Sequence, residues 1–266
     1  MLEINNIYKT FNPGQITEKK AIKGLSLSIN DGDFVTVIGG NGAGKSTLLN
    51  LISGVYSVDS GSIILDGIDV TKQKEYKRAK YLGRVFQDPL LGTAASMGIE
   101  ENLALAARRG QFRSLRWGIT SEERKEYREK LALLELGLEN RLSAKVGLLS
   151  GGQRQALTLL MATLRKPKLL LLDEHTAALD PKTAKKVLDL TEHFIKKDNL
   201  TAFMITHNMK DAIKYGNRLI MMMDGKIVYD VSGEEKQKLE VSDLLKKFQS
   251  ASGDWESSVS DKMLLI

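Results

Sequence analysis

Four glycines, a lysine and a serine lie close together in residues 39–46, in the order Gly-Gly-Asn-Gly-Ala-Gly-Lys-Ser. This order matches the pattern of a glycine, four residues and then Gly-Lys-Ser, which cradles phosphate groups. Glycines allow the backbone to curl so that successive N–H groups point inward at phosphate oxygens. Lys45 would bind the β and γ phosphates, and the Ser46 hydroxyl would be a ligand of Mg²⁺. We therefore expect a nucleotide to be bound by Gly39, Gly40, Asn41, Gly42, Ala43, Gly44, Lys45 and Ser46.

Two acidic residues, Asp173 and Glu174, directly follow the apolar run at residues 169–172. Such a run predicts a buried strand, and ligands of open α/β sheets bind at the carboxyl ends of the strands. There Asp173 would hold Mg²⁺, directly or through water, and Glu174 would polarise the water that attacks the γ-phosphate. A solvated turn is the alternative for the pair taken by itself.

A second candidate anion site begins at residue 149 with the sequence Leu-Ser-Gly-Gly-Gln. It leads into residues 155–164, which predict a helix, so its free N–H groups lie at the positive end of the helix dipole. A plain helix cap is the alternative in isolation. Because the segment follows a phosphate loop and precedes Asp173 by 23 residues, we expect phosphate contacts from Ser150, Gly151, Gly152 and Gln153.

The elements around these segments must position them, and their pattern predicts an α/β fold. Residues 34–38 are β-branched and almost all apolar, which predicts a buried strand before the phosphate loop. Residues 46–52 predict the helix that follows it. A glycine turn that binds nothing is the alternative, and the strand–loop–helix context favours the nucleotide. Residues 25–29 and 63–65 predict further strands separated by glycine turns.

The middle third changes to a helical period. Residues 99–164 are rich in Leu, Ala, Glu, Arg and Lys and contain no strand-like run. Thr120 and Glu123 have the spacing of a capping box and predict a helix over 124–136.

Strands and helices alternate again in the last third of the chain. The predicted elements are strands at 169–172 and 201–206, helices at 182–197 and 241–248, and a hairpin at 218–229 around Asp224-Gly225. The alternation predicts a largely parallel sheet with helices on both faces.

Length and composition limit the class of protein. With 266 residues, 42% hydrophobic and 27% charged, the chain has enough apolar side chains for a buried core, which excludes a disordered protein. The absence of cysteine excludes a disulfide scaffold and a cysteine-ligated metal site. We expect neither a signal peptide nor a membrane span, because charged residues interrupt every long apolar stretch. The net charge of +6 indicates acidic partners without naming them.

The order of the motifs resembles that of the nucleotide-binding subunits of ATP-binding-cassette transporters, over nearly the whole chain. The matching motifs are the phosphate loop at 39–46, Gln87, the signature at 149–153, the acid strand at 169–174, residues 178–180 and His207. The resemblance implies a P-loop NTPase (RecA-like) core with a mixed parallel sheet, an N-terminal antiparallel β region and an inserted helical subdomain. We expect the core and β region at 1–88 and 160–232, the helical subdomain at 89–159, and a C-terminal helix and tail at 233–266.

The resemblance also implies hydrolysis of ATP with Mg²⁺ and gives roles to single residues. Gln87 would contact the metal and the attacking water, and His207 would contact the γ-phosphate and help to hold Glu174. The implied catalytic residues are Glu174, His207 and Gln87, and the implied metal ligands are Ser46, Gln87 and Asp173. An aromatic residue near the N-terminus would stack on adenine; Phe11 is the candidate and Tyr8 the reserve, with core packing as the alternative for Phe11.

The signature implies an assembly. In the family, two subunits meet head to tail, and residues 150–153 of one close over the ATP held by residues 39–47 of the other. The implied partners are a second copy or a paired cassette in the ATP-bound state, with Asp180 at the interface, and integral membrane permease subunits. The chain would then lie at the cytoplasmic face of the cell membrane. The subgroup it resembles serves binding-protein-dependent importers, which implies an extracytoplasmic solute-binding protein and aromatic amino acids or related small solutes as cargo.

The chain departs from the family pattern at His175, where many members have proline after the acid pair. The backbone there is less restricted than with proline, and an imidazole lies near Glu174 in the sequence. Two interpretations are open: the imidazole tunes the carboxylate of Glu174, or the substitution has no effect on activity. His175 is therefore not placed among the catalytic residues.

Two other classes of protein are alternatives. A soluble cassette ATPase without a transport role, of the iron–sulfur assembly type, fits the length, whereas the repair type does not, because no sustained heptads separate the halves. Basic residues at 72–80 are the basis for a second alternative, a nucleic-acid-binding protein. No recognised nucleic-acid motif accompanies them, so we expect no nucleic-acid partner. A second basic cluster is a solvated face or contacts anionic lipid headgroups near the permease; it comprises Arg108, Arg109, Arg113 and Arg116.

Overall fold

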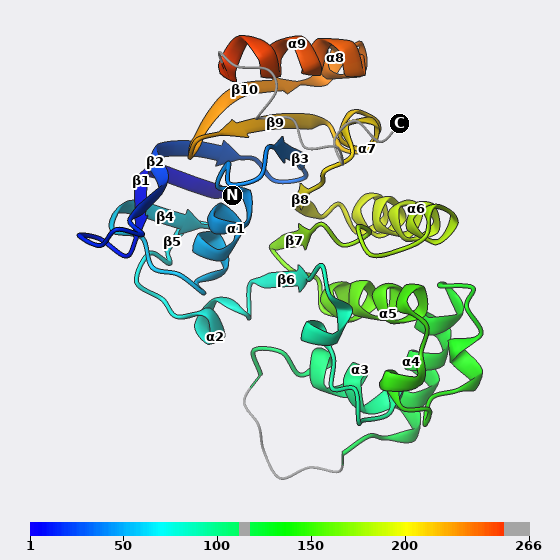
Figure 1. The fold of residues 1–266 in the computed structure, drawn as a ribbon. Helices are drawn as coiled ribbons and strands as arrows, with labels where there is room; N and C mark the ends of the chain where they lie inside the picture. The colour runs from blue at the N-terminus through cyan, green and yellow to red at the C-terminus, as the bar shows by residue number, and fades with distance from the viewer. Residues whose placement is uncertain (112–117, 253–266) are drawn as a thin grey trace. The chain divides into compact units, whose positions relative to one another are not determined.

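The computed structural model describes residues 1–111 and 118–252. The chain forms two compact units, the first made of residues 1–78 together with the chain from residue 201 onward, and the second of residues 79–200. Each unit has its own strands and helices, labelled in Figure 1. The sequence-predicted polar tail after residue 252 lies outside the described residues.

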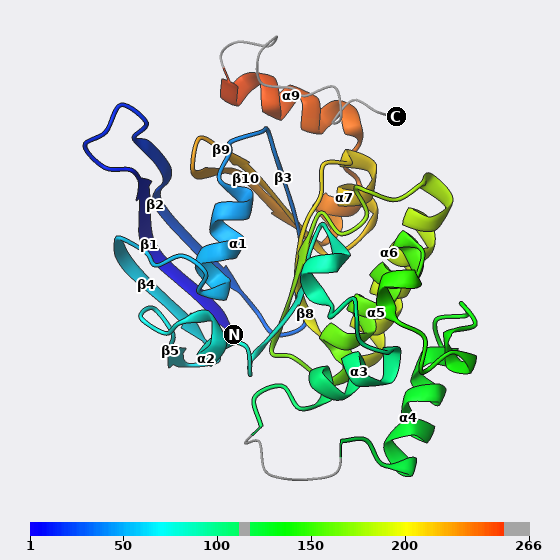
Figure 2. The same cartoon turned by 60° about the horizontal axis from the view of Figure 1, so that its bottom comes forward.

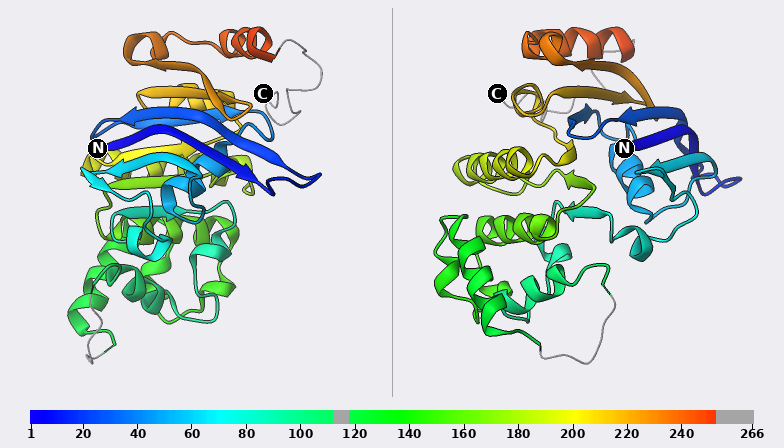
Figure 3. Two further views of the ribbon diagram at one scale, coloured as in Figure 1. Left: turned by 90° about the vertical axis from the view of Figure 1, so that its left-hand side faces the viewer. Right: turned by 180° about the vertical axis from the view of Figure 1, so that it is seen from behind.

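The first unit contains an antiparallel sheet with the strand order β2-β1-β4-β5. Its strands are β1 (Leu2–Phe11), β2 (Lys19–Ile29), β4 (Ser60–Leu65) and β5 (Ile68–Asp69). In β2 the alternating pattern is realised: Leu25, Leu27 and Ile29 are buried, and the serines between them are exposed. Figure 3 shows β1 and β2 running side by side, as their antiparallel pairing requires.

A second sheet of the first unit carries the strand that precedes the phosphate loop. Its strands are β3 (Phe34–Gly39), β8 (Thr201–Ile205), β9 (Arg218–Met223) and β10 (Lys226–Ser232). Within this unit the order is β10-β9-β3-β8, with β3 parallel to both of its neighbours and β10 antiparallel to β9. All six residues of β3 are buried, as its apolar sequence predicts. The predicted hairpin turns at Asp224 and Gly225, which both have positive φ angles, 47° and 75°.

The helices of the first unit pack against these sheets. They are α1 (Lys45–Ser53), α2 (Glu75–Arg78), α7 (Met209–Lys214), α8 (Gly233–Gln237) and α9 (Val241–Ser252). Helix α1 contacts β2 of one sheet and β3 of the other and lies between them in Figure 2. Helix α9 buries Leu244 and Phe248 in a cluster that includes Ile38 of β3 and Met221 of β9, which confirms the predicted amphipathic helix.

The second unit consists of two parallel strands and the helical region. The strands are β6 (Leu82–Val85) and β7 (Leu169–Asp173). The α-helices are α3 (Ile99–Ala107), α4 (Ser121–Ala132), α5 (Gly151–Leu164) and α6 (Pro181–Asp198), and the 3-10 turns are η1 (Pro89–Gly92), η2 (Leu138–Asn140) and η3 (Val146–Leu148). Helix α5 contacts α3, α6 and β6, and Figure 3 shows it alongside α6. Among the described residues between β6 and β7, strand pairing is limited to one isolated bridge between Gly98 and Lys145, so the predicted helical region is confirmed there.

The α/β class predicted from the sequence is confirmed. The capping box sets the start of α4, because Thr120 accepts a hydrogen bond from the Glu123 amide at 3.2 Å and the helix begins at the next residue. The helix ends at residue 132 rather than at the predicted 136, and the chain then turns through Glu135 and Gly137, both with positive φ. None of the helices in the described part of the chain is both long and apolar enough to cross a membrane.

Candidate active site

The glycine-rich loop connects the end of β3 directly to the start of α1. Gly42 and Gly44 have φ angles of 80° and 100°, the left-handed region that glycine adopts without strain, and Gly44 is the N-cap of α1. The first turn of α1 contains no acidic residue, so its free N–H groups and the positive end of its dipole are not compensated by a side chain. The loop therefore has the backbone of an anion-binding site.

Two glycines of the loop are also required for packing within the first unit. A Cβ atom on Gly39 would overlap the backbone carbonyl of Met222 in β9, and one on Gly44 would lie 2.7 Å from the carbonyl oxygen of Ala21 in β2. A Cβ atom on Gly42 would meet only the Lys19 ammonium, at 3.4 Å. The glycines thus serve two purposes, because they allow the turn and also let neighbouring strands approach it.

The loop lysine is folded over the loop itself. Lys45 is 5% exposed, and its Nζ atom donates to the carbonyl oxygens of Gly39 and Gly40 at 2.7 and 3.2 Å. Ser46 and Asn41 are exposed, and Thr47 is half-buried. The positive charge of Lys45 is thereby held beside the backbone that would bind phosphate.

Phe11 lies at the end of β1 and is half-buried. Its ring contacts the Tyr56 ring edge to face, with 5.2 Å between centroids, and the Lys9 ammonium lies 5.6 Å from its centroid. Tyr8, the reserve candidate for stacking, is 43% exposed. Sequence reasoning missed Tyr56, because 45 residues separate it from Phe11 and it lies in the loop between α1 and β4.

His207 follows β8 at the same end of the sheet as the phosphate loop. Val37 of β3 lies opposite Ile205 of β8 in parallel register, so Gly39 and His207, each two residues further on, leave the sheet together. The turn is held by Thr206, whose amide donates to the Val37 carbonyl oxygen at 3.1 Å. The first unit thus brings the candidate histidine toward the loop, as the motif order predicts.

The second unit brings Gln87 and the acid pair together in the same way. Val85 of β6 lies opposite Leu172 of β7 in parallel register, so Gln87 and the pair Asp173 and Glu174 follow the same ends of adjacent strands. Glu174 has a φ angle of 46°, the left-handed region that costs a residue with a Cβ about 1 kcal/mol. Its carbonyl oxygen accepts a hydrogen bond from the Ala177 amide at 2.9 Å, which holds the turn after β7.

His175 is buried and turned toward α6. It is 2% exposed, and its Nε2 atom lies 3.0 Å from the hydroxyl of Thr191. That hydroxyl donates its own proton to the Val187 carbonyl at 2.8 Å, so the His175 Nε2–H is the donor of the pair. Burial lowers the pKa of the imidazole to about 4. His175 is therefore a neutral anchor between the acid turn and α6.

The signature segment forms the N-terminus of α5. The Ser150 hydroxyl accepts from the Gln153 amide and the Gln153 side chain accepts from the Ser150 amide, both at 3.2 Å, which completes a capping box. Ser150 and Gly151 are exposed, and the first turn of α5 contains no acidic residue. The segment is a helix cap and also an exposed, positively polarised helix end, and its contact with a phosphate stays a prediction.

The signature segment packs closely against α6, which the sequence did not indicate. A Cβ atom on Gly152 would overlap the side chain of Thr183 in α6, whereas one on Gly151 would meet only Leu179, at 3.5 Å. Asp180, expected at an interface, is the N-cap of α6 and accepts from the Thr183 amide at 3.1 Å. That role accounts for the lowered pKa of Asp180, because the hydrogen bonds from Thr183 stabilise its charged form.

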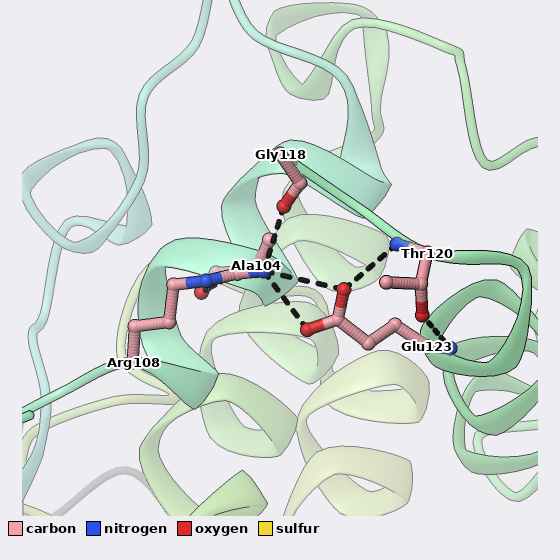
Figure 4. Close-up of polar contacts among 5 residues, drawn as sticks. All are labelled: Ala104, Arg108, Gly118, Thr120 and Glu123. Carbon is pink, nitrogen blue, oxygen red and sulfur yellow. Dashed lines mark hydrogen bonds and ion pairs between the residues drawn. The ribbon is translucent and has the colours of Figure 1, made fainter. Parts of the chain in front are cut away.

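The arginines at the end of α3 have partners inside the second unit. Arg108 donates to both carboxylate oxygens of Glu123 at 2.9 and 3.2 Å and to the carbonyl oxygens of Ala104 and Gly118. Figure 4 shows that Glu123 lies between Arg108 and Thr120 and so joins this ion pair to the capping box of α4. Arg109 donates to two backbone carbonyls near the end of α5, and Arg113 and Arg116 lie outside the described residues. These contacts give Arg108 and Arg109 roles in the fold.

Each residue predicted to hold a magnesium ion has an oxygen atom of the kind that this ion prefers. A hydroxyl, a side-chain amide and a carboxylate, from Ser46, Gln87 and Asp173, offer the hard oxygen ligands that Mg²⁺ prefers. In the described ranges no group of three or more His, Cys, Asp and Glu side chains could hold a metal by itself.

Known proteins share this combination of fold and motifs. A sequence profile of the family described as "ABC transporter" matches residues 22–177, which include the phosphate loop, Gln87, the signature and the acid pair. A solved dimeric ATP-binding cassette in a post-hydrolysis state, with ADP and phosphate bound, matches with a TM-score of 0.75 at 30% identity, covering 87% of this chain and 98% of the other. A cassette in its ADP conformation matches with a TM-score of 0.76 at 29% identity, covering 96% and 99%.

The fold and the motifs thus define an ATP-binding cassette with a P-loop NTPase core, and the chain belongs to the ABC transporter family as an ATP-hydrolysing subunit. Among named relatives, the chain is 48% identical over 252 residues to a "Tyrosine transport ATP-binding protein" of Clostridioides difficile, covering 94% of this chain and 100% of the relative. It is 36% identical to the "ABC transporter ATP-binding protein YxdL" of Bacillus subtilis, covering 89% of each. The family that the motif order predicts is confirmed.

Proposed function

We propose that the chain drives solute uptake through a separate membrane permease, and that ATP closes two copies, or this chain and a paired cassette, head to tail. The observation that carries the proposal is the N-terminus of α5, where Ser150 and Gly151 are exposed and no acidic side chain compensates the helix dipole. The phosphate loop already provides an anion site at the start of α1. A second exposed anion site on the same chain is satisfied when a phosphate from another subunit reaches it.

The residues of the proposed site have separate roles in binding and hydrolysis. Lys45 and the loop backbone bind the phosphates of ATP. Ser46, Gln87 and Asp173 would hold Mg²⁺, which would supply positive charge against the β and γ phosphates. Glu174 takes a proton from the attacking water, and His207 contacts the γ-phosphate. Hydrolysis removes the γ-phosphate contact shared between the subunits and so releases the dimer.

Named relatives support the proposed cargo and the other proposed partners. Two of them are named for import or transport of small solutes: the tyrosine transport protein and the "Spermidine/putrescine import ATP-binding protein PotA" of Haemophilus influenzae. The former covers nearly the whole chain at the higher identity, which supports an aromatic amino acid as cargo. The partners are integral permease subunits and an extracytoplasmic solute-binding protein, with the chain held at the cytoplasmic face of the membrane.

The proposed division of the chain follows the same family pattern. The core and β region occupy residues 1–88 and 160–232, the permease-facing helical subdomain 89–159, and the C-terminal helix and tail 233–266.

The variant Glu174→Gln tests the head-to-tail dimer. It retains the size and hydrogen-bonding shape of the side chain but cannot take a proton from water, so the ATP-bound dimer should persist. Light scattering after gel filtration with Mg²⁺ and ATP should give twice the monomer mass for the variant. Glu192→Gln is the matched control, because Glu192 lies on α6 in an exposed ion pair with Lys196.

Two outcomes would contradict the proposal. A Glu174→Gln variant that hydrolyses ATP at the normal rate would show that Glu174 is not the base, and one that stays monomeric with ATP would refute the dimer. Affinity purification from membranes then distinguishes transport from a soluble role of the iron–sulfur assembly type: a polytopic permease as main partner supports transport, and an entirely soluble set of partners refutes it.

A further inference from the structure

Arg84 lies in β6, between strand residues that are apolar or glycine. It pairs in register with Leu171 of β7, and Asp173 is two residues further along β7. Since strand side chains alternate between faces, Arg84, Leu171 and Asp173 lie on the same face of the two-strand pair, together with Phe86. The register thus places a guanidinium beside the carboxylate that we assign to Mg²⁺.

The side chain of Arg84 is held between a ring and an acid. Its guanidinium carbon lies 4.4 Å from the centroid of the Phe86 ring, and its Nη2 atom lies 3.7 Å from Oδ2 of Asp173. The side chains of Arg84 and Asp173 are only 14% and 16% exposed, so the pair is largely shielded from water. In such a place a charge is costly unless it is compensated, and the Asp173 carboxylate and the Phe86 ring face supply that compensation.

We propose that Arg84 is a positioning residue that competes with Mg²⁺ for the carboxylate of Asp173 and so sets the magnesium concentration that the site requires. The inference rests on the proposed role of Asp173 as a metal ligand. A cation within 4 Å of a carboxylate attracts it, and it also repels a second cation at the same oxygen atoms. Because the pair is partly buried, salt and water screen this repulsion only in part. Arg84 keeps Asp173 in one orientation and at the same time weakens its hold on Mg²⁺.

The test is a magnesium titration of nucleotide binding with the full chain. A fluorescent ADP analogue reports binding without turnover, and its affinity is measured over a range of Mg²⁺ concentrations. The midpoint is the Mg²⁺ concentration at which half of the change in affinity has occurred. Arg84→Met removes the charge and retains an unbranched apolar side chain, and Arg84→Lys retains the charge. Arg124→Met is the matched control: it also removes one positive charge from the second unit, where Arg124 pairs with Glu100 at 2.8 Å.

Arg84→Met should reach its midpoint at a Mg²⁺ concentration roughly threefold to tenfold lower than the wild type, because the competing charge is gone. Arg84→Lys and Arg124→Met should remain within about twofold of the wild type. In an Asp173→Asn background the effect of Arg84→Met should disappear, since the carboxylate that both cations share is absent. Should Arg84→Met not fold by circular dichroism, Arg84→Gln makes the same measurement with a polar side chain.

An unchanged or higher midpoint in Arg84→Met or Arg84→Gln would overturn the inference, and so would an equal shift in Arg124→Met. Loss of nucleotide binding by folded Arg84→Met at every Mg²⁺ concentration would also overturn it, because Arg84 would then be needed for binding itself. Failure of the proposed function looks different: the wild type would bind no nucleotide, or its binding would not respond to Mg²⁺ or to Asp173→Asn.

Discussion

The side-chain amide of Gln155 donates a hydrogen bond to the carbonyl oxygen of Phe86 at 3.1 Å. Gln155 is 1% exposed and lies in α5, just after the signature segment, and Phe86 directly precedes Gln87. One contact therefore joins the helix that begins at the signature to the backbone of the proposed metal-contacting glutamine. It gives a direct physical connection between the two motifs of the second unit.

We expect Gln155→Leu to lower the free energy of unfolding by about 1–3 kcal/mol, because the partly buried Phe86 carbonyl loses its donor. Urea denaturation followed by circular dichroism measures the change. Thr158→Val is the control, since the Thr158 hydroxyl donates to the carbonyl of Gln155 in the same helix, and its loss should cost less. A Gln155→Leu variant as stable as the wild type would mean that the contact contributes nothing.

Gly152→Ala should destabilise the second unit by about 1–3 kcal/mol, the usual cost of overpacking. The added Cβ atom overlaps the methyl group of Thr183 in α6, so either the Thr183 side chain has to leave its rotamer or the two helices have to move apart. Gly151→Ala adds the same atom one residue earlier, where Leu179 is at an ordinary contact distance, and should be tolerated. Thermal unfolding compares the two, and Thr183→Ser, which removes the overlapping methyl group, should rescue Gly152→Ala. Equal melting temperatures for both alanine variants would refute the packing argument.

Phe11→Ala should weaken binding of ATP by roughly tenfold, because base–aromatic stacking contributes about 1–3 kcal/mol. Tyr8→Ala, the reserve position, should bind nearly as the wild type does. Fluorescence titration with an ATP analogue that carries its fluorophore on the ribose measures both affinities. The opposite order of effects would assign the adenine to Tyr8, and no effect in either variant would leave Phe11 as a core residue.

His175 predicts a specific loss of stability in acid. Its pKa is lowered to about 4 in the folded chain, against 6.5 for the ordinary imidazole, because burial disfavours the charged ring. Below pH 6.5 the unfolded chain binds a proton that the folded chain does not, so stability falls as the pH drops toward 4. The folded and unfolded pKa values of His175 differ by about 2.5 units. Once the pH is below both values, this difference lowers the free energy of unfolding by roughly 3 kcal/mol.

The comparison with His175→Gln isolates this contribution, because all other titrating groups are common to both proteins. Urea unfolding is measured at pH 7 and pH 4.5 in the presence of a chelator. Between these pH values the free energy of unfolding should fall less for the variant than for the wild type. Parallel losses in the two proteins would mean that the buried imidazole does not titrate as its surroundings predict.

Much of the site was predictable because its chemistry depends on residues close together in the chain. The curl of the phosphate loop, the capping box at Ser150 and Gln153 and the acids after a buried strand each need a span of a few residues. Parallel strands also place the residues after them at one end of a sheet, so His207 beside the loop, and Gln87 beside the acid pair, follow from strand order. The strand β6 was not predicted, because four residues with an arginine among them carry little periodicity.

The sequence by itself determined the family, the fold class and the candidate catalytic and binding residues, since these depend on short motifs in a fixed order. The tertiary structure decided which distant side chains meet: Arg84 with Asp173, Gln155 with the Phe86 backbone, and Phe11 with Tyr56. It also gave His175 its role, because only the packing of α6 over the acid turn buries the ring against Thr191. The physical reason is strand register and helix packing, which bring residues together across long separations that no local spacing encodes.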